Sequence, residues 1–262
     1  MRVGGAHAMM AGAVAIGGVS LALFGWFLVF GPIPVADLQL SEAERLIWDA
    51  GLSLLFFLQH SVMVRRRVQA AMAGTVPEPY YPTFYAIASG IFLLAVVLLW
   101  QPSAQVWYRL ELPFSLAPRL ISLLALVGFV WAVRALGRFD PFGLDSIRNH
   151  LRGRTPRPSD LTVRGPYLHV RHPLYSLILV LTWSTPWLSA DRLLFDLLWT
   201  GWMVVATHLE ERDLVAYFGD AYRRYQRAVP MLVPWHMLAR VGSWRMPGTR
   251  DEPVEPDDRE DG

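Results

Sequence analysis

Long apolar runs separated by short polar segments dominate the chain. Six runs are long enough, or nearly long enough, to cross a bilayer as helices: 9–31, 46–64, 84–100, 120–133, 174–188 and 193–209. The last two are short and read as a tight hairpin. The pattern therefore predicts an all-α fold, a polytopic membrane helix bundle of about six transmembrane helices that ends in a helical hairpin. The alternative for the first run is a cleaved signal peptide. The length of the apolar run and the lack of a small-residue cleavage site after it disfavour that alternative.

Arginines are unevenly distributed among the loops between these runs. Loop 32–45 has three acidic residues against one arginine, a net charge of −2, and loop 102–118 has one of each. Loop 65–83 has three arginines against one glutamate, or +2, and 134–171 has eight against three aspartates, or +5. Because arginine-rich loops remain in the cytoplasm, both termini and the polar segments around the final hairpin are predicted to be cytoplasmic.

Composition supports one membrane unit. The chain is 53% hydrophobic and 18% charged, with 11 Trp residues and no cysteine, and all 24 basic residues are arginine. These absences exclude a disulfide, a thiolate nucleophile and a Schiff-base lysine. We expect a single domain over 1–244, a long cytoplasmic loop over 138–163 that could close over a site, and a disordered acidic tail over 245–262. No histidine spacing indicates a metal site, and nothing indicates a nucleic-acid partner.

The first polar segment with candidate chemistry precedes the hairpin. Pro173 suits the first turn of a helix, and it pushes His172 out of the α region, so His172 is predicted at a helix mouth. The unpaired N–H groups of such a mouth favour an anionic ligand group such as a carboxylate. Tyr167 and Tyr175 add flat amphipathic walls. The alternative for Arg171 is an interfacial side chain that reaches lipid headgroups, and the tyrosines could belong to an aromatic belt.

The second candidate segment follows the hairpin. Glu210 and Glu211 end an apolar helix with two carboxylates, which could accept hydrogen bonds from hydroxyl groups or pair with a cation. The alternative is a structural ion pair with one of three arginines: Arg164, Arg171 or Arg212.

Beyond these glutamates, turn-forming residues predict a change of direction. Gly219 is expected to break the helix and Asp220 to cap a new one. Tyr222 and Tyr225, three residues apart, are predicted to share one face of that helix.

Together the two segments read Gly-x-Tyr-x-x-Val-Arg-His-Pro-x-Tyr at 165–175, then Glu-Glu-x-x-Leu at 210–214 and Phe-Gly-x-x-Tyr-x-x-Tyr at 218–225. This double motif resembles the isoprenylcysteine carboxyl methyltransferase class of membrane enzymes, which includes phospholipid methyltransferases, over about 120–235. Upstream, Gln-His-Ser-Val-Met-Val-Arg at 59–65 and the start of the helix at 80–85 resemble bacterial methanethiol S-methyltransferases, relatives of NnrU-type proteins. Val64 and the stretch 80–83 depart from that narrower pattern.

The resemblance implies a bacterial inner-membrane enzyme that transfers the methyl group of S-adenosylmethionine to a small or lipophilic acceptor. A thiol is favoured, with methanethiol giving dimethyl sulfide. The acceptor is expected near His60 and Arg65, the candidate catalytic residues. The residues implied to bind the cofactor are Tyr167, Arg171, His172, Pro173, Tyr175, Glu210, Glu211, Tyr222 and Tyr225.

Other functions remain open at this point. The acceptor could be an isoprenylcysteine carboxylate or a phospholipid amine. NnrU-type relatives suggest a haem-binding or redox protein, with His60 and His208 as candidate axial ligands. A transporter or scaffold is disfavoured because the spans lack a polar stripe. His60 could also be a hydrogen-bonded contact between helices with no role in chemistry.

Overall fold

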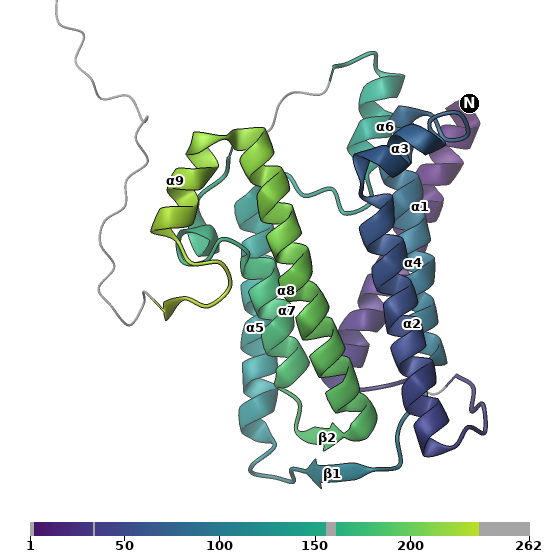
Figure 1. Ribbon diagram of the computed structural model, residues 1–262, viewed down its shortest axis with the longest axis vertical. Coiled ribbons are helices and arrows are strands. Elements are labelled where there is room, and N and C mark those ends of the chain that lie inside the picture. Colours follow the sequence, from purple (N-terminus) through teal and green to yellow (C-terminus); the bar gives the residue numbers. More distant parts are fainter. Residues whose placement is uncertain (1–2, 34, 156–160, 236–262) are drawn as a thin grey trace, which may run out of the picture.

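The computed structural model describes residues 3–33, 35–155 and 161–235, and the predicted acidic tail lies outside them. The described residues form a helix bundle (Figure 1) with these helices: α1 (Val3–Phe30), α2 (Glu42–Met63), α3 (Arg66–Met72), α4 (Tyr81–Leu99), α5 (Leu116–Leu136), α6 (Leu144–Leu151), α7 (Pro173–Trp183), α8 (Ala190–Phe218) and α9 (Asp220–Ala228). Short 3₁₀ turns, η1 (Glu78–Tyr80) and η2 (Gly165–Leu168), precede α4 and α7. Two short strands, β1 (Val106–Arg109) and β2 (Trp187–Ser189), pair in an antiparallel ladder that the sequence did not predict.

The predicted membrane helix bundle is confirmed. Among the described residues, α1, α2, α4 with its preceding turn, and α5 are long and apolar enough to cross a membrane. The count of six is not confirmed, because α7 has only 11 residues and α8, with 29, carries charged residues near both ends. The fifth predicted span ends early, at Trp183. Pro186 disfavours the helical conformation at Thr185, and the chain then enters β2.

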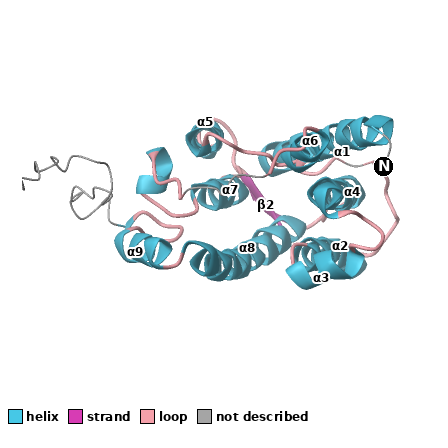
Figure 2. Ribbon diagram, turned by 90° about the horizontal axis from the view of Figure 1, so that it is seen from above, coloured by secondary structure: helices cyan, strands magenta, loops and turns pink. Residues whose placement is uncertain are grey.

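The helices divide into two groups. Helices α1, α2 and α4 form one, and α5, α7 and α8 form the other, with α7 between α5 and α8 (Figure 2). Helix α2 contacts both α4 and α8 and so joins the groups. The described parts of the arginine-rich loops 65–83 and 134–171 lie at the same end of the bundle as α9 and the N-terminal end of α1, whereas β1 and β2 lie at the other end (Figure 1). The loops therefore sort by charge as the sequence predicted.

Stacked aromatic rings hold α2 against α8. The ring of Phe56 lies 5.3 Å from that of Trp199 at an angle of 14°, and the ring of Phe57 lies 4.6 Å from that of Trp202 at 8°. Trp202 Nε1 also donates to Ser61 Oγ over 3.2 Å. Such ring pairs stabilise a contact by about 0.5–1.5 kcal/mol beyond the burial of their area. They place the C-terminal end of α2 firmly beside α8.

The loop predicted over 138–163 is partly helical. Residues 144–151 form α6, which packs against α4 and η1 instead of covering the mouth of α7. Thr83 Oγ1 donates to the carbonyl of Gly143 over 2.7 Å. Gly143 has a φ of +66°, and a Cβ there would lie 2.5 Å from the carbonyl carbon of Pro82, so only glycine permits this approach. Residues 156–160 of the loop lie outside the described residues.

Candidate functional site

The first motif forms the mouth of α7 as predicted. Pro173 is the first residue of the helix, and His172 before it has a non-helical backbone with φ −121° and ψ 64°. The backbone N–H groups of Arg171 and His172 donate to the carbonyls of Pro230 and Met231 over 2.9 and 3.1 Å. These bonds fasten the chain that leaves α9 alongside the residues that enter α7.

The second motif forms a sharp turn between α8 and α9. Gly219 has φ +59° and ψ −131°, a conformation open to glycine, and it ends α8 as predicted. The predicted cap is wrong by one position, because Gly219 itself is the N-cap and Asp220 is the first helical residue. At that position the carboxylate of Asp220 still interacts favourably with the positive end of the helix dipole. Tyr222 and Tyr225 are buried on one face of α9, with ring centroids 5.7 Å apart, which confirms that prediction.

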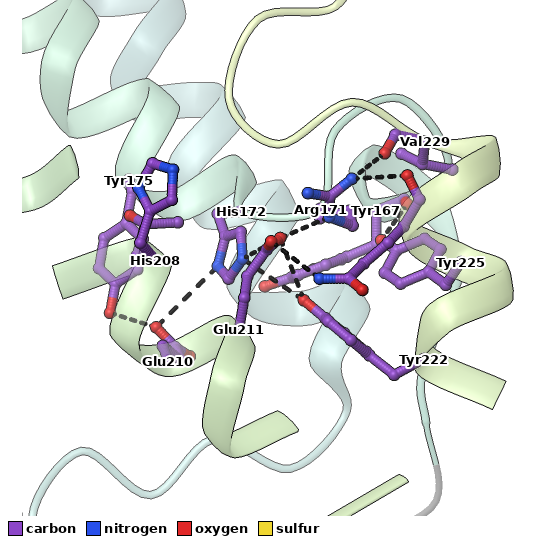
Figure 3. Close-up of polar contacts among 12 residues, drawn as sticks. Tyr167, Arg171, His172, Tyr175, His208, Glu210, Glu211, Tyr222, Tyr225 and Val229 are labelled. Atoms are coloured by element: carbon purple, nitrogen blue, oxygen red, sulfur yellow. Dashed lines mark hydrogen bonds and ion pairs between the residues drawn. The ribbon is translucent and has the colours of Figure 1, made fainter. Parts of the chain in front are cut away.

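Glu211 is surrounded by donors from the protein itself (Figure 3). Its Oε1 accepts from Arg171 Nε over 2.5 Å and lies 3.2 Å from His172 Nε2 and 3.4 Å from the hydroxyl of Tyr222. Its Oε2 accepts from the side chain of Gln226 over 3.0 Å. The side chain is only 10% exposed. The ion-pair alternative is therefore realised for Glu211, which holds two motifs together.

Arg171 completes this frame. Its NH1 group donates to the carbonyl oxygen of Gln226 in the last turn of α9, over 2.9 Å, and to that of Val229, the residue that follows the helix. With 9% of its side chain exposed, it points into the protein. The alternative of an arginine that reaches lipid headgroups is therefore wrong for Arg171. Its guanidinium fork instead joins α8, α9 and the mouth of α7.

Glu210 has a different environment, although it is the adjacent residue. Its side chain is 44% exposed, and its Oε2 accepts from the hydroxyl of Tyr175 over 2.8 Å. The same oxygen lies 4.0 Å from His172 Nδ1. The rings of His172 and Tyr175 stack with centroids 5.7 Å apart and an angle of 16°. Glu210, His172 and Tyr175 thus form a cluster with an accessible carboxylate (Figure 3).

Burial and charge shift the pKa values of these groups in opposite ways. Burial lowers the pKa of His172, although the carboxylates of Glu210 and Glu211 oppose that shift. Burial also opposes ionisation of Glu211, but the hydrogen bond and charge of Arg171 outweigh it and lower the pKa of this carboxyl. A neutral His172 ring that donates from Nε2 to Glu211 keeps Nδ1 as an acceptor. His172 Nδ1 and Glu210 Oε2 are then two acceptors that face each other.

The other motif tyrosines lie inside the fold. Tyr225 donates to the carbonyl of Tyr167 over 2.5 Å, and Tyr167, Tyr222 and Tyr225 are all buried. Burial, together with the charge of Glu210, raises the pKa of Tyr167 to about 12. An aromatic belt at the membrane surface does not account for these three tyrosines, because their rings are covered by protein.

His60 and Arg65 have separate partners. The hydroxyl of Tyr85 lies 3.0 and 2.8 Å from the two ring nitrogens of His60, and Ser89 Oγ lies 3.3 Å from Nδ1. The side chain of Arg65 lies 3.9 Å from Asp213 on α8. The structure therefore places His60 between α2 and α4 and directs Arg65 toward α8.

Sequence reasoning missed Tyr85 and Ser89. With Tyr81 they form a polar stripe at four-residue intervals along an apolar helix, and that spacing is the signal that would have found them. The expectation that the spans lack a polar stripe is therefore wrong for α4.

Ser61, next to His60, accepts from Trp202 on α8, and Arg65 lies near Asp213, three residues beyond Glu210. The end of α2 that carries His60 therefore lies beside α8, the helix that carries Glu210.

Comparisons with known proteins place the chain in a family. It is 35% identical to methanethiol S-methyltransferase 1 of Bradyrhizobium diazoefficiens over 198 residues, which are 74% of this chain and 69% of that protein. It is 35% identical to methanethiol S-methyltransferase of Pseudomonas deceptionensis over 195 residues, 72% of each chain. Nurim of Sus scrofa is 31% identical over 212 residues, 74% of each chain. No protein-family model and no solved structure matches the chain.

Fold, motifs and relatives together define the class: the protein is an integral membrane methyltransferase of the isoprenylcysteine methyltransferase-like type. Within that class, the chain belongs to the methanethiol S-methyltransferase family.

Proposed function

We propose that this enzyme transfers the methyl group of S-adenosylmethionine to methanethiol and so produces dimethyl sulfide. The observation that carries the proposal is the accessible cluster of Glu210, His172 and Tyr175, held at the mouth of α7 by the buried pair of Arg171 and Glu211. The names of the relatives supply the acceptor.

The residues of the cluster suit this donor. Glu210 Oε2 and His172 Nδ1, 4.0 Å apart, are two acceptors that an amine or hydroxyl group of the donor would bridge. The first-turn N–H groups of α7 favour its carboxylate, and the ring of Tyr175 offers a flat wall. When bound, S-adenosylmethionine supplies an electrophilic methyl group together with its own leaving group. Glu211 is excluded from this contact, because protein donors already fill its positions.

We assign the acceptor side to His60. During methylation the thiol sulfur gains a carbon–sulfur bond, the sulfonium carbon–sulfur bond breaks, and the S–H proton must leave. A neutral imidazole accepts such a proton or orients the thiol. Tyr85, bonded to the ring, fixes its position between α2 and α4.

Product analysis tests the proposed function. Purified enzyme incubated with S-adenosylmethionine and methanethiol should release dimethyl sulfide, measured by gas chromatography, and S-adenosylhomocysteine in equal amounts. An isoprenylcysteine and a phospholipid with an amine headgroup serve as competing acceptors. Methylation of either of these compounds in place of methanethiol would show that methanethiol is not the acceptor.

Glu210→Gln tests the assigned binding residue. The substitution removes a charge-assisted hydrogen bond, which contributes about 1.5–3 kcal/mol, so the dissociation constant for S-adenosylmethionine should rise by roughly tenfold or more. Asp213→Asn, which neutralises an exposed carboxylate on the same helix, is the matched control and should leave it unchanged. Calorimetric titration measures both. Equal affinity in Glu210→Gln and wild type would return Glu210 to a purely structural role.

We further propose that the site faces the cytoplasm, where the methyl donor is made. The +2 and +5 loops gather at the end of the bundle that carries the site. A reporter fused after Trp235 should be active in its cytoplasmic form and silent in its periplasmic form. The reverse pattern would invert the orientation.

A further inference from the structure

A second concave region lies beside the proposed acceptor residue. It is a cavity of about 610 Å³ between α3, α4 and the start of α6. Its walls include these mainly apolar side chains: Met63, Ala70, Ala73, Val76, Tyr81 and Tyr85. The hydroxyl of Tyr81 donates to the carbonyl of Met63 over 2.8 Å and ties the end of α2 to α4 along one wall.

Tyr85 connects this cavity to His60. One side chain both lines the cavity and places its hydroxyl within 2.8 Å of a ring nitrogen of His60. Met63 and Val64, at the end of α2, also line the cavity, and Arg65, the next residue, lies 3.9 Å from Asp213, three residues beyond Glu210 on α8. A molecule in the cavity therefore contacts Tyr85, the partner of His60, and lies beside the end of α2 that contacts α8 near Glu210.

The size of the cavity exceeds what methanethiol requires. Methanethiol has only two heavy atoms, whereas pockets of roughly 300–1,000 Å³ bind drug-sized molecules. Four polar side chains also line the cavity: Arg66, Gln69, Glu78 and Ser146. Most of its lining is nevertheless apolar or aromatic, which favours a ligand with a lipophilic body.

We propose that this cavity is the acceptor pocket and that it admits lipophilic thiols larger than methanethiol, such as aryl thiols and medium-chain alkyl thiols. This inference rests on the proposed methyl transfer to a thiol. In this proposal the sulfur of the thiol points toward Tyr85 and His60, and its hydrocarbon part occupies the space between α3 and α4. The reaction stays the same: the sulfur gains the methyl group and the S–H proton leaves.

Filling the cavity tests the assignment. All three alanines are exposed, but Ala70 and Ala73 line the cavity and Ala71 does not, so Ala70→Trp and Ala71→Trp are matched variants. Wild type should methylate thiophenol and hexanethiol as well as methanethiol. In Ala70→Trp, kcat/KM for the two larger thiols should fall by about tenfold or more while that for methanethiol changes far less. Ala71→Trp should behave as wild type with all three.

Each possible outcome decides the question. Turnover of methanethiol without turnover of either larger thiol overturns this inference and leaves the proposed function intact, whereas failure to methylate any thiol overturns the proposed function itself. Unchanged selectivity in Ala70→Trp shows that larger thiols bind elsewhere and also overturns the inference. If Ala70→Trp loses all activity, its affinity for S-adenosylmethionine is measured. Intact affinity supports the cavity as the acceptor pocket, and lost affinity indicates misfolding, in which case Ala73→Trp decides by the same selectivity criterion.

Discussion

Replacing His60 by glutamine is expected to lower the turnover of methanethiol by about 10²–10⁴-fold, the usual range for a positioned acid–base group, while affinity for S-adenosylmethionine stays nearly intact. Glutamine keeps a side chain that can hydrogen-bond to Tyr85 and Ser89, so the helix contact survives, but it cannot accept the thiol proton. The measurements are steady-state rates and calorimetric affinities on the same preparations.

The pH dependence separates chemistry from structure at His60. The thiol of free cysteine has a pKa of about 8.5. As the pH rises toward and beyond the pKa of the acceptor thiol, the difference in turnover rate between wild type and His60→Gln should therefore shrink. If the residue only joins two helices, His60→Gln should retain most of its rate, and His60→Ala should lose about 0.6–2 kcal/mol of stability without a pH-dependent rate effect. A Soret band in wild type that the variants lack would assign His60 to haem instead.

Arg171→Ala is expected to destabilise the site-bearing end of the bundle by about 3–5 kcal/mol, because it leaves the carboxylate of Glu211 buried without its cation. The substitution also removes the donor to the carbonyls of Gln226 and Val229, so α9 should detach from the mouth of α7. Denaturant titration of the enzyme in detergent measures the loss, and limited proteolysis should show earlier cleavage around α9.

Two further variants control this experiment. Arg224→Ala removes an exposed arginine from α9 and should change stability by less than about 0.5 kcal/mol. Arg171→Lys keeps the charge without the planar fork and should fall between wild type and alanine. Wild-type stability in Arg171→Ala would show that the buried pair does not hold the site together.

Much of the architecture could be predicted because its causes are local. Pro173 limits the backbone of the residue before it, so the mouth of α7 could be placed at His172. Gly219 adopts a backbone conformation closed to other residues, so the end of α8 was equally visible. The apolar runs could likewise be recognised as helices, because hydropathy is also a local property of the sequence. The ends of helices were harder to predict where a segment pairs with a part of the chain that is distant in sequence. One example is β2, which pairs with β1 and shortens the fifth predicted span.

The sequence identified the residues of the candidate site, but it could not show which glutamate is buried and which is accessible. The motifs named both glutamates as cofactor contacts, since nothing in the sequence distinguishes two adjacent carboxylates. Their difference comes from the helical rotation of about 100° between neighbouring residues, which turns Glu211 toward Arg171 and leaves Glu210 beside Tyr175. Similarly, His60 was visible as a histidine within a predicted span, and the spacing of Tyr85 and Ser89 marked them as polar, but nothing in the sequence showed that these residues contact each other.

The sequence by itself determined that this protein is a helical membrane protein with arginine-rich loops on one side and two motifs flanking the last apolar segments. These features depend on hydropathy, charge and the backbone limits of proline and glycine, which act within a few residues. The tertiary structure decided that Glu211 is buried among protein donors while the carboxylate of Glu210 stays accessible, and that Tyr85 both contacts His60 and lines a cavity. These contacts join residues 25 to 58 positions apart, and only the packing of whole helices brings them together.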